Sequence, residues 1–274
     1  MPQGWPAIAE RRPHYVIFGE THGTREAPAF VGRIACALAS DGERLLVAVE
    51  QSATDNAALQ AAWRLPADRF EPALGAAGWA GREDGVASEA MFALLVRLHG
   101  LKEAGVAVDV AAFNGMRDDA QRARLAGLPG QGPHEAAQAE NIRDAAAAGD
   151  YDRILILVGS FHARKSPVGE GADRFEPMAM RLARYGPTTS LRMRDAGGSM
   201  WNCIPKPGTN VRPGQPITAD KIDCGIHPTR GDSDLKRAPF MQLGPFPGGE
   251  PGRDYDGFIW LGPVSGSPPL VAGK

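Results

Sequence analysis

Short apolar runs rich in β-branched residues alternate with amphipathic stretches along the first two-thirds of the chain. The apolar runs predict strands at residues 14–19, 44–50, 106–113, 153–159 and 188–193. Apolar residues at helical spacing, together with good helix formers, predict helices at residues 25–40, 54–63, 88–103, 133–148 and 174–185. The stretch 71–85 is rich in Gly and Ala and is predicted to be a loop.

The order of these elements predicts the fold class. Strand, helix and strand follow one another within residues 14–50, which is typical of a βαβ unit with parallel strands and a right-handed crossover. The same alternation continues through residue 195. We therefore expect an α/β fold in which a mostly parallel sheet carries helices on both faces, formed by a core domain over residues 1–196.

The pattern changes near Gly197, where the regular alternation stops. Twelve of the 23 prolines lie between Pro205 and Pro269, and proline interrupts both helices and central strands. The same stretch holds several aromatic residues, which argues against disorder. We expect residues 197–274 to form an irregular, Pro- and Gly-rich extension packed on the core within a single domain, with residues 255–261 as a late edge strand.

The composition is that of an ordinary globular protein and narrows the possible partners. Among the 274 residues, 30 are basic and 32 acidic, which leaves a formal net charge of -2. No nucleic-acid partner is expected, because such proteins carry a basic surface. No apolar run approaches the roughly 20 residues that cross a bilayer, so no membrane span is expected. The first residues lack a secretory signal, which predicts a cytoplasmic protein, or a periplasmic one if the chain has been trimmed.

The three cysteines are too few and too widely spaced for a disulfide scaffold or a zinc knuckle. Cys36 lies in an amphipathic helix pattern, where we expect a small core residue. Cys203 and Cys224 could pair in an oxidising compartment, and the sequence leaves that question open.

Two of the predicted strands end in the same short motif. Gly-x-x-His follows both strand 14–19 and strand 153–159, while strand 44–50 ends in a glutamate. The carboxyl ends of parallel strands meet at one edge of a sheet, where ligands and catalytic groups collect. We therefore expect one catalytic site made of Glu20, His22, Glu50 and His162.

This set of side chains can do three different kinds of chemistry. His22, Glu50 and His162 could bind a divalent metal such as Mn, Co or Zn as a two-histidine, one-carboxylate set. Without a metal, one histidine could act as a general base while a glutamate orients its imidazole. An imidazole could also ligate haem iron. The sequence does not choose among the three.

Other residues near the same edge are candidates for substrate binding. Asn114 and Arg117 follow the third predicted strand, and Arg164 lies just past the second Gly-x-x-His motif, so each could reach the site and bind a substrate anion. The remaining histidines, including His134 at the start of a helix, are expected to be structural. No glycine-rich nucleotide loop, Gly-x-Ser-x-Gly elbow or His-Glu-x-x-His helix is present in the sequence.

Taken together, these motifs resemble the TIKI/erythromycin-esterase/ChaN-like superfamily. The residues that carry the resemblance are 19–23, Glu50 and 159–163, with the helical segment at 138–142. The match covers about residues 14–185. It implies an α/β fold with a mainly parallel sheet, and a cleft at the carboxyl edge of the strands with Glu20, His22, Glu50 and His162 as the site.

The resemblance implies several activities rather than one. Members include macrolide-hydrolysing esterases, metal-dependent proteases and haem-binding proteins of iron uptake. We expect a hydrolase that cleaves an ester or amide bond in a small molecule or peptide. The reaction could depend on a bound metal. The alternative from another class is a haem- or metal-binding carrier without turnover, and a third is a domain that has lost activity. The oligomeric state stays open.

Overall fold

The computed structural model describes residues 1–79, 82, 84–209, 217–249 and 252–270. The helices are α1 (Trp5–Ala9), α2 (Glu26–Ser40), α3 (Asn56–Trp63), α4 (Ala67–Ala76), α5 (Glu89–Glu103), α6 (Asp119–Leu125), α7 (Gly132–Ala147) and α8 (Met178–Leu182). The strands are β1 (Tyr15–Glu20), β2 (Leu45–Ser52), β3 (Val108–Asn114), β4 (Arg153–Gly159), β5 (Thr188–Arg194), β6 (Gly198–Pro205), β7 (Ile222–Thr229), β8 (Phe240–Leu243) and β9 (Gly257–Trp260).

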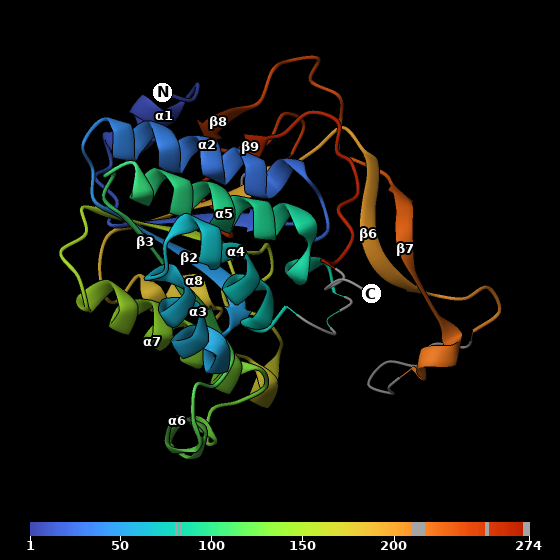
Figure 1. The fold of residues 1–274 in the computed structure, drawn as a ribbon. Coiled ribbons are helices and arrows are strands. Elements are labelled where there is room, and N and C mark those ends of the chain that lie inside the picture. Colours follow the sequence, from blue (N-terminus) through green and yellow to red (C-terminus); the bar gives the residue numbers. More distant parts are fainter. Residues whose placement is uncertain (80–81, 83, 210–216, 250–251, 271–274) are drawn as a thin grey trace.

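Seven of these strands form the main sheet, in the order β3-β2-β4-β1-β5-β9-β8 (Figure 1). Every neighbouring pair is parallel except β8 and β9, which run antiparallel. Because β4 lies between β1 and β2, the ends of these three strands are adjacent at one edge of the sheet. The expected α/β fold with a mostly parallel sheet is confirmed.

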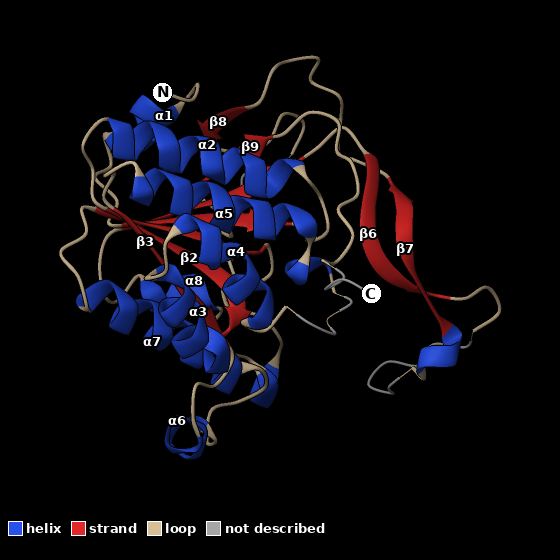
Figure 2. Cartoon of the chain, in the orientation of Figure 1, coloured by secondary structure: helices blue, strands red, loops and turns tan. Residues whose placement is uncertain are grey.

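Helices cover both faces of the sheet, with α2 and α5 on one side and α7 and α8 on the other (Figure 2). Successive residues of β1 point to opposite faces: Val16 and Phe18 pack in the apolar layer under α2 and α5, whereas Tyr15 and Ile17 pack in the layer under α7 and α8. A strand that is buried on both faces reads as a continuous apolar run, which is why the central strands could be located from the sequence.

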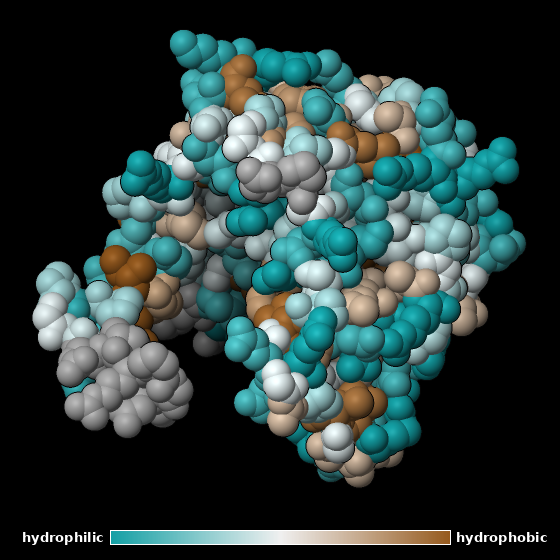
Figure 3. All heavy atoms as spheres, turned by 180° about the vertical axis from the view of Figure 1, so that it is seen from behind, coloured by the Kyte–Doolittle hydropathy of each residue, from teal (hydrophilic) through white to brown (hydrophobic). Residues whose placement is uncertain are grey.

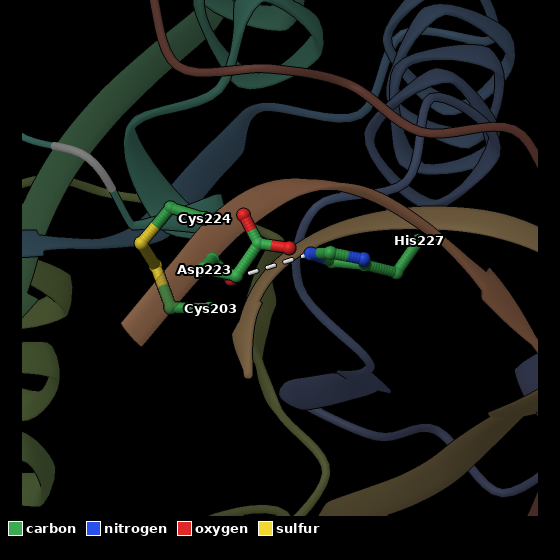
Figure 4. The surroundings of a disulfide bond; sticks show 4 residues. All are labelled: Cys203, Asp223, Cys224 and His227. Carbon is green, nitrogen blue, oxygen red and sulfur yellow. Dashed lines mark hydrogen bonds between the residues drawn. A yellow bond between two sulfur atoms is a disulfide. The ribbon is translucent and has the colours of Figure 1, made fainter. Parts of the chain in front are cut away.

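Strands β6 and β7 form a separate antiparallel hairpin, called the arm below. The arm projects from the main body, and from behind it stands apart from that body across a hollow (Figures 1 and 3). Cys203 and Cys224 lie directly opposite each other in the arm and form a disulfide (Figure 4). Nearby, Nε2 of His227 faces the Asp223 carbonyl at 3.3 Å. The disulfide answers the question that the sequence left open.

Two predictions for helical and loop segments were wrong. The stretch 71–85 was expected to be a loop, but α4 continues to Ala76; residues 80, 81 and 83 of that stretch lie outside the described chain. Pro72 inside α4 weakens a helix signal, yet Phe70 and Leu74 are buried against the core and hold the helix. The helix expected at 174–185 is only the short α8, because Phe175 pairs instead with Val168 in a β-bridge.

The extension after residue 197 is more regular than expected. Strand β9 was expected at the edge of the sheet, but it lies between β5 and β8, so the edge position belongs to β8. The side chains of Phe258 and Trp260 in β9 are buried, which fits an interior strand. Helix α6 was not predicted. None of the helices in the described chain is long and apolar enough to cross a membrane.

Candidate functional site

The ends of β1, β4 and β2 bring the candidate side chains together. Glu20 is the last residue of β1, Glu50 lies near the end of β2, and His22 and His162 sit in the turns that follow β1 and β4. The structure therefore places all four residues at the one sheet edge where the sequence pattern put them.

His22 lies between two buried carboxylates. Its Nδ1 is 3.0 Å from Oε1 of Glu20, and its Nε2 is 3.3 Å from Oε2 of Glu50. Both glutamates are almost fully buried, whereas 28% of the His22 side chain remains exposed. The imidazole is thus held from within and open to solvent on one side.

His162 has a similar arrangement with a different outer partner. Its Nδ1 donates to Oε1 of Glu135 at 2.7 Å, while its Nε2 is 3.5 Å from Oε1 of Glu50. The other oxygen of Glu135 accepts the backbone N–H of Met178 at 2.8 Å, which anchors the carboxylate between α7 and α8. A 3.5 Å separation is too long for a strong hydrogen bond, so Nε2 of His162 is the less engaged nitrogen of the ring.

Glu50 is the carboxylate that both histidines share. Its Oε2 accepts the backbone N–H of Gly159 at 2.6 Å, which fixes the side chain against the end of β4. A Cβ atom at Gly159 would come within 2.9 Å of Nε2 of His22 and 3.6 Å of Oε2 of Glu50. Glycine at this position is what allows the imidazole and the carboxylate to approach the backbone so closely.

The carboxylates set the charge state of His22. Burial alone would lower the pKa of His22, but the hydrogen bonds and negative charges of Glu20 and Glu50 outweigh it and raise that pKa well above 6.5. Burial would raise the pKa of Glu50, yet His22, His162 and the Gly159 N–H together lower it. For Glu20 burial dominates, and its pKa is raised despite the neighbouring imidazole.

His162 is shifted in the same direction as His22. Burial works to lower the pKa of His162, but the hydrogen bond to Glu135 and the charge of Glu50 raise it above 6.5. The site thus contains two imidazoles whose protonated forms are favoured by three surrounding carboxylates.

The sequence analysis did not assign Glu135 or the adjacent His134 to the site. Glu135 is completely buried in α7, and the ring of His134 lies 5.6 Å from that of His162. Burial lowers the pKa of His134, and its Nε2 accepts from Nε2 of Gln138 at 3.0 Å, which fits a neutral ring. A signal existed: Glu135 and Gln138 are polar but share the helical spacing of the apolar residues that face the sheet.

The three predicted substrate-binding residues have partners of their own. Oδ1 of Asn114 accepts from Gln138 at 2.9 Å, which links Asn114 to His134 beside the site. Arg117 forms an ion pair with Asp144 at 2.5 Å. Nη2 of Arg164 is 2.8 Å from Oδ2 of Asp254. A role for these residues in binding a substrate anion stays a prediction.

His22, Glu50 and His162 are the side chains of the site that could ligate a metal ion. A ligating imidazole needs one nitrogen without a proton and usually donates its other N–H to a carboxylate. In both His22 and His162, Nδ1 is bonded to a carboxylate and Nε2 faces Glu50. Among the described residues, no group of three or more His, Cys, Asp or Glu side chains is arranged to hold a metal ion. Binding of Mn, Co or Zn by His22, Glu50 and His162 stays a prediction.

The site is also compared with the requirements of a haem ligand. A haem ligand also needs a free imidazole nitrogen, together with an apolar pocket beside it. Tyr15 and Phe18, which could have lined such a pocket, are buried in the two core layers on either side of the sheet. The haem-binding alternative is therefore not favoured.

Comparison with known proteins supports the fold. No protein-family model and no curated protein matches the chain. Among solved structures, a mutant of the erythromycin esterase EreC in its open conformation is 12% identical, with a TM-score of 0.65 over 98% of this chain and 95% of that one. A succinoglycan biosynthesis protein is 10% identical, with a TM-score of 0.56 over 96% and 91% of the two chains. These likenesses show an erythromycin-esterase-like fold, and the relation to TIKI and ChaN proteins stays a prediction.

Proposed function

We propose that this protein is a hydrolase that cleaves an ester or amide bond in a small molecule or peptide, with the cluster around Glu50 as its catalytic centre. The observation that carries the proposal is the Glu135–His162 pair, in which a buried carboxylate holds Nδ1 of an imidazole whose Nε2 is only weakly engaged. A carboxylate and imidazole in this relation form the orienting half of a general-base system. The likeness of the fold to that of an erythromycin esterase supports the same reaction class.

In the proposed reaction His162 is the general base. Its Nε2 takes a proton from a water molecule as the water oxygen bonds to the carbonyl carbon of the substrate. Glu135 and Glu50 stabilise the imidazolium that forms, because their carboxylates face its two nitrogens. When the tetrahedral intermediate collapses, the bond from carbon to the leaving oxygen or nitrogen breaks, and His162 returns its proton to the leaving group.

His22 has a different part, because Glu20 and Glu50 favour its protonated form. An imidazolium is a poor base but supplies positive charge where the substrate carbonyl oxygen becomes negative. Glu20 and Glu135 do not contact the reacting atoms in this scheme and act as positioning residues. Glu50 faces Nε2 of both imidazoles, and its negative charge balances their positive charge.

The proposal is tested with a panel of chromogenic esters and amides and three histidine variants. His162→Asn and His22→Asn should each lower kcat by about 10²–10⁴-fold on any substrate found, with little change in Tm. His227→Asn is the matched control, because that histidine lies in the arm and its ring faces the backbone carbonyl of Asp223. Full activity in both site variants would overturn the assignment of the catalytic centre.

A further inference from the structure

A second pocket lies beside the site, on the neighbouring strands β5 and β9. Its volume is about 220 Å³, and the residues that matter for its chemistry are Arg192, Arg194, Phe246, Tyr255 and Phe258. None of the proposed catalytic residues lines it. Arg192 and Arg194 are two positions apart in β5, so both side chains leave the same face of the sheet.

The two arginines differ in whether their charge is balanced. Nη1 of Arg194 is 2.5 Å from Oδ1 of Asp232. Arg192 forms no ion pair with any carboxylate in the part of the chain that the structure describes. Asp256 also lines the pocket, but its two oxygens are each 2.8 Å from Nζ of Lys165 and are therefore already neutralised. Counted over the described residues, the pocket consequently carries one guanidinium charge in excess.

Tyr255 senses the same excess of positive charge. Its hydroxyl donates to the Ser160 carbonyl at 2.7 Å, and its ring lies 5.8 Å from the guanidinium carbon of Arg192. Burial raises the pKa of Tyr255, and Arg192, Arg164 and Arg194 all oppose that rise, with Asp254 adding to it. The charges of three guanidinium groups thus act on this hydroxyl, and two of those groups are already paired, Arg164 with Asp254 and Arg194 with Asp232.

Aromatic rings form part of the pocket wall beside the two arginines and Asp256. The rings of Phe246 and Phe258 meet edge to face with their centroids 5.1 Å apart, and the guanidinium carbon of Arg194 lies 5.4 Å from the centroid of Phe246. Flat walls favour a planar ligand, and a guanidinium with free donors matches the two oxygens of a carboxylate.

We propose that this pocket binds a small aromatic monocarboxylate, with Arg192 holding the carboxylate and the Phe246 and Tyr255 rings packing on the planar body. One excess guanidinium balances one negative charge, which is why a monoanion fits better than a dianion. The site stands apart from the proposed hydrolase activity and needs no turnover.

The pocket adjoins the catalytic edge of the sheet. In the sheet register Arg192 pairs with Gly19, the residue before Glu20. Tyr255 holds the Ser160 carbonyl, two residues before His162. A ligand that contacts Arg192 and Tyr255 would therefore lie close to the chain segments that carry Glu20 and His162.

Calorimetric titration of the full chain with benzoate tests the proposal. Wild type should bind benzoate saturably with one site, and Arg192→Gln should weaken the affinity by roughly tenfold or more. Arg192→Lys should fall between the two, because it keeps the charge but loses the paired donors. Phe246→Ala, which removes a wall and leaves Arg192 in place, should also weaken binding.

Arg33→Gln is the matched control. The Arg33 guanidinium also lies over a phenyl ring, 5.4 Å from the centroid of Phe30, but lines a different pocket. The Arg33→Gln variant should bind benzoate with the affinity of wild type. The proposal is overturned if wild type shows no saturable binding, if Arg192→Gln binds as well as wild type, or if inorganic phosphate binds as tightly as benzoate. Because none of these readouts uses turnover, they are independent of whether the hydrolase proposal holds.

Discussion

Glu135 and His162 lie 27 residues apart in the chain and are joined by a 2.7 Å hydrogen bond between a fully buried carboxylate and the imidazole Nδ1. Helix α7 supplies the carboxylate, the first residue of α8 anchors it through the Met178 N–H, and the turn after β4 supplies the ring. Three separate elements therefore fix the orientation of one imidazole. An imidazole whose orientation is held by several surrounding elements is a preorganised base, unlike a histidine that merely lies at a strand end.

The pH dependence of turnover follows from the two imidazoles. His162 acts as a base only when it is neutral, and because its pKa is raised, activity should increase with pH through a midpoint above 6.5. His22 must stay protonated, so activity should decrease again as the pH rises past the pKa of His22, which Glu20 and Glu50 raise well above 6.5. The measurement is kcat/KM against pH with the best ester of the panel. An acid limb with its midpoint below pH 6.5 would contradict these roles.

Gly159→Ala should disable the site without unfolding the protein. The added Cβ would lie 2.9 Å from Nε2 of His22, so the imidazole must move away from Glu50. We expect a loss of about 10²-fold in kcat, since small displacements of catalytic groups cost that much. Gly100→Ala is the matched control: it lies in α5 with nothing within 4 Å of its added Cβ, and it should keep full activity and be slightly more stable. Equal kcat in wild type and Gly159→Ala would count against the site.

The disulfide should hold the arm in its folded form. Closing a loop between Cys203 and Cys224, 21 residues apart, removes unfolded-state entropy worth roughly 3 kcal/mol. Reduction, or Cys203→Ser, should therefore speed proteolytic cleavage between residues 198 and 229 while the core stays intact. Cys36→Ser is the control and should change nothing, because that cysteine is not in the disulfide. Unchanged cleavage of the reduced arm would show that the strands hold without the bond.

Removal of divalent metals should leave turnover unchanged. In the proposed mechanism Nε2 of His162 takes the proton of the attacking water directly, so no metal-bound hydroxide is required. The check is turnover after dialysis against a chelator, followed by addition of Mn, Co or Zn. Activity that is lost on dialysis and restored by one of these ions would assign His22, Glu50 and His162 to a metal instead.

The sequence was sufficient to predict the sheet edge but not the full site. Strand-end positions carry a strong signal, because β1, β2 and β4 are buried on both faces and the Gly-x-x-His turns come directly after two of them. Glu135 carries a weak signal, since it lies within a helix and the packing of α7 on β3 and α8 is what shows that it is buried.

The segments that were predicted wrongly depend on contacts distant in sequence. Helix α4 contains Pro72 and is held by the burial of Phe70 and Leu74, whose i,i+4 spacing is too short a signal to outweigh the proline and the glycines around it. Strand β9 is interior because β8 pairs with it, and β8 is a four-residue strand in a proline-rich stretch. Short strands of this kind form only when a neighbour offers a free edge.

The most direct test of the account is the pH profile of Glu135→Gln measured beside that of wild type. The neutral amide can still accept the Met178 N–H but no longer raises the pKa of His162, so the acid limb should move to lower pH and kcat should fall. Glu71→Gln, a change of the same kind at an exposed position of α4, should leave both quantities unchanged. If Glu135→Gln kept the wild-type kcat and the same acid limb, Glu135 would not orient a catalytic base and the proposed mechanism would be wrong.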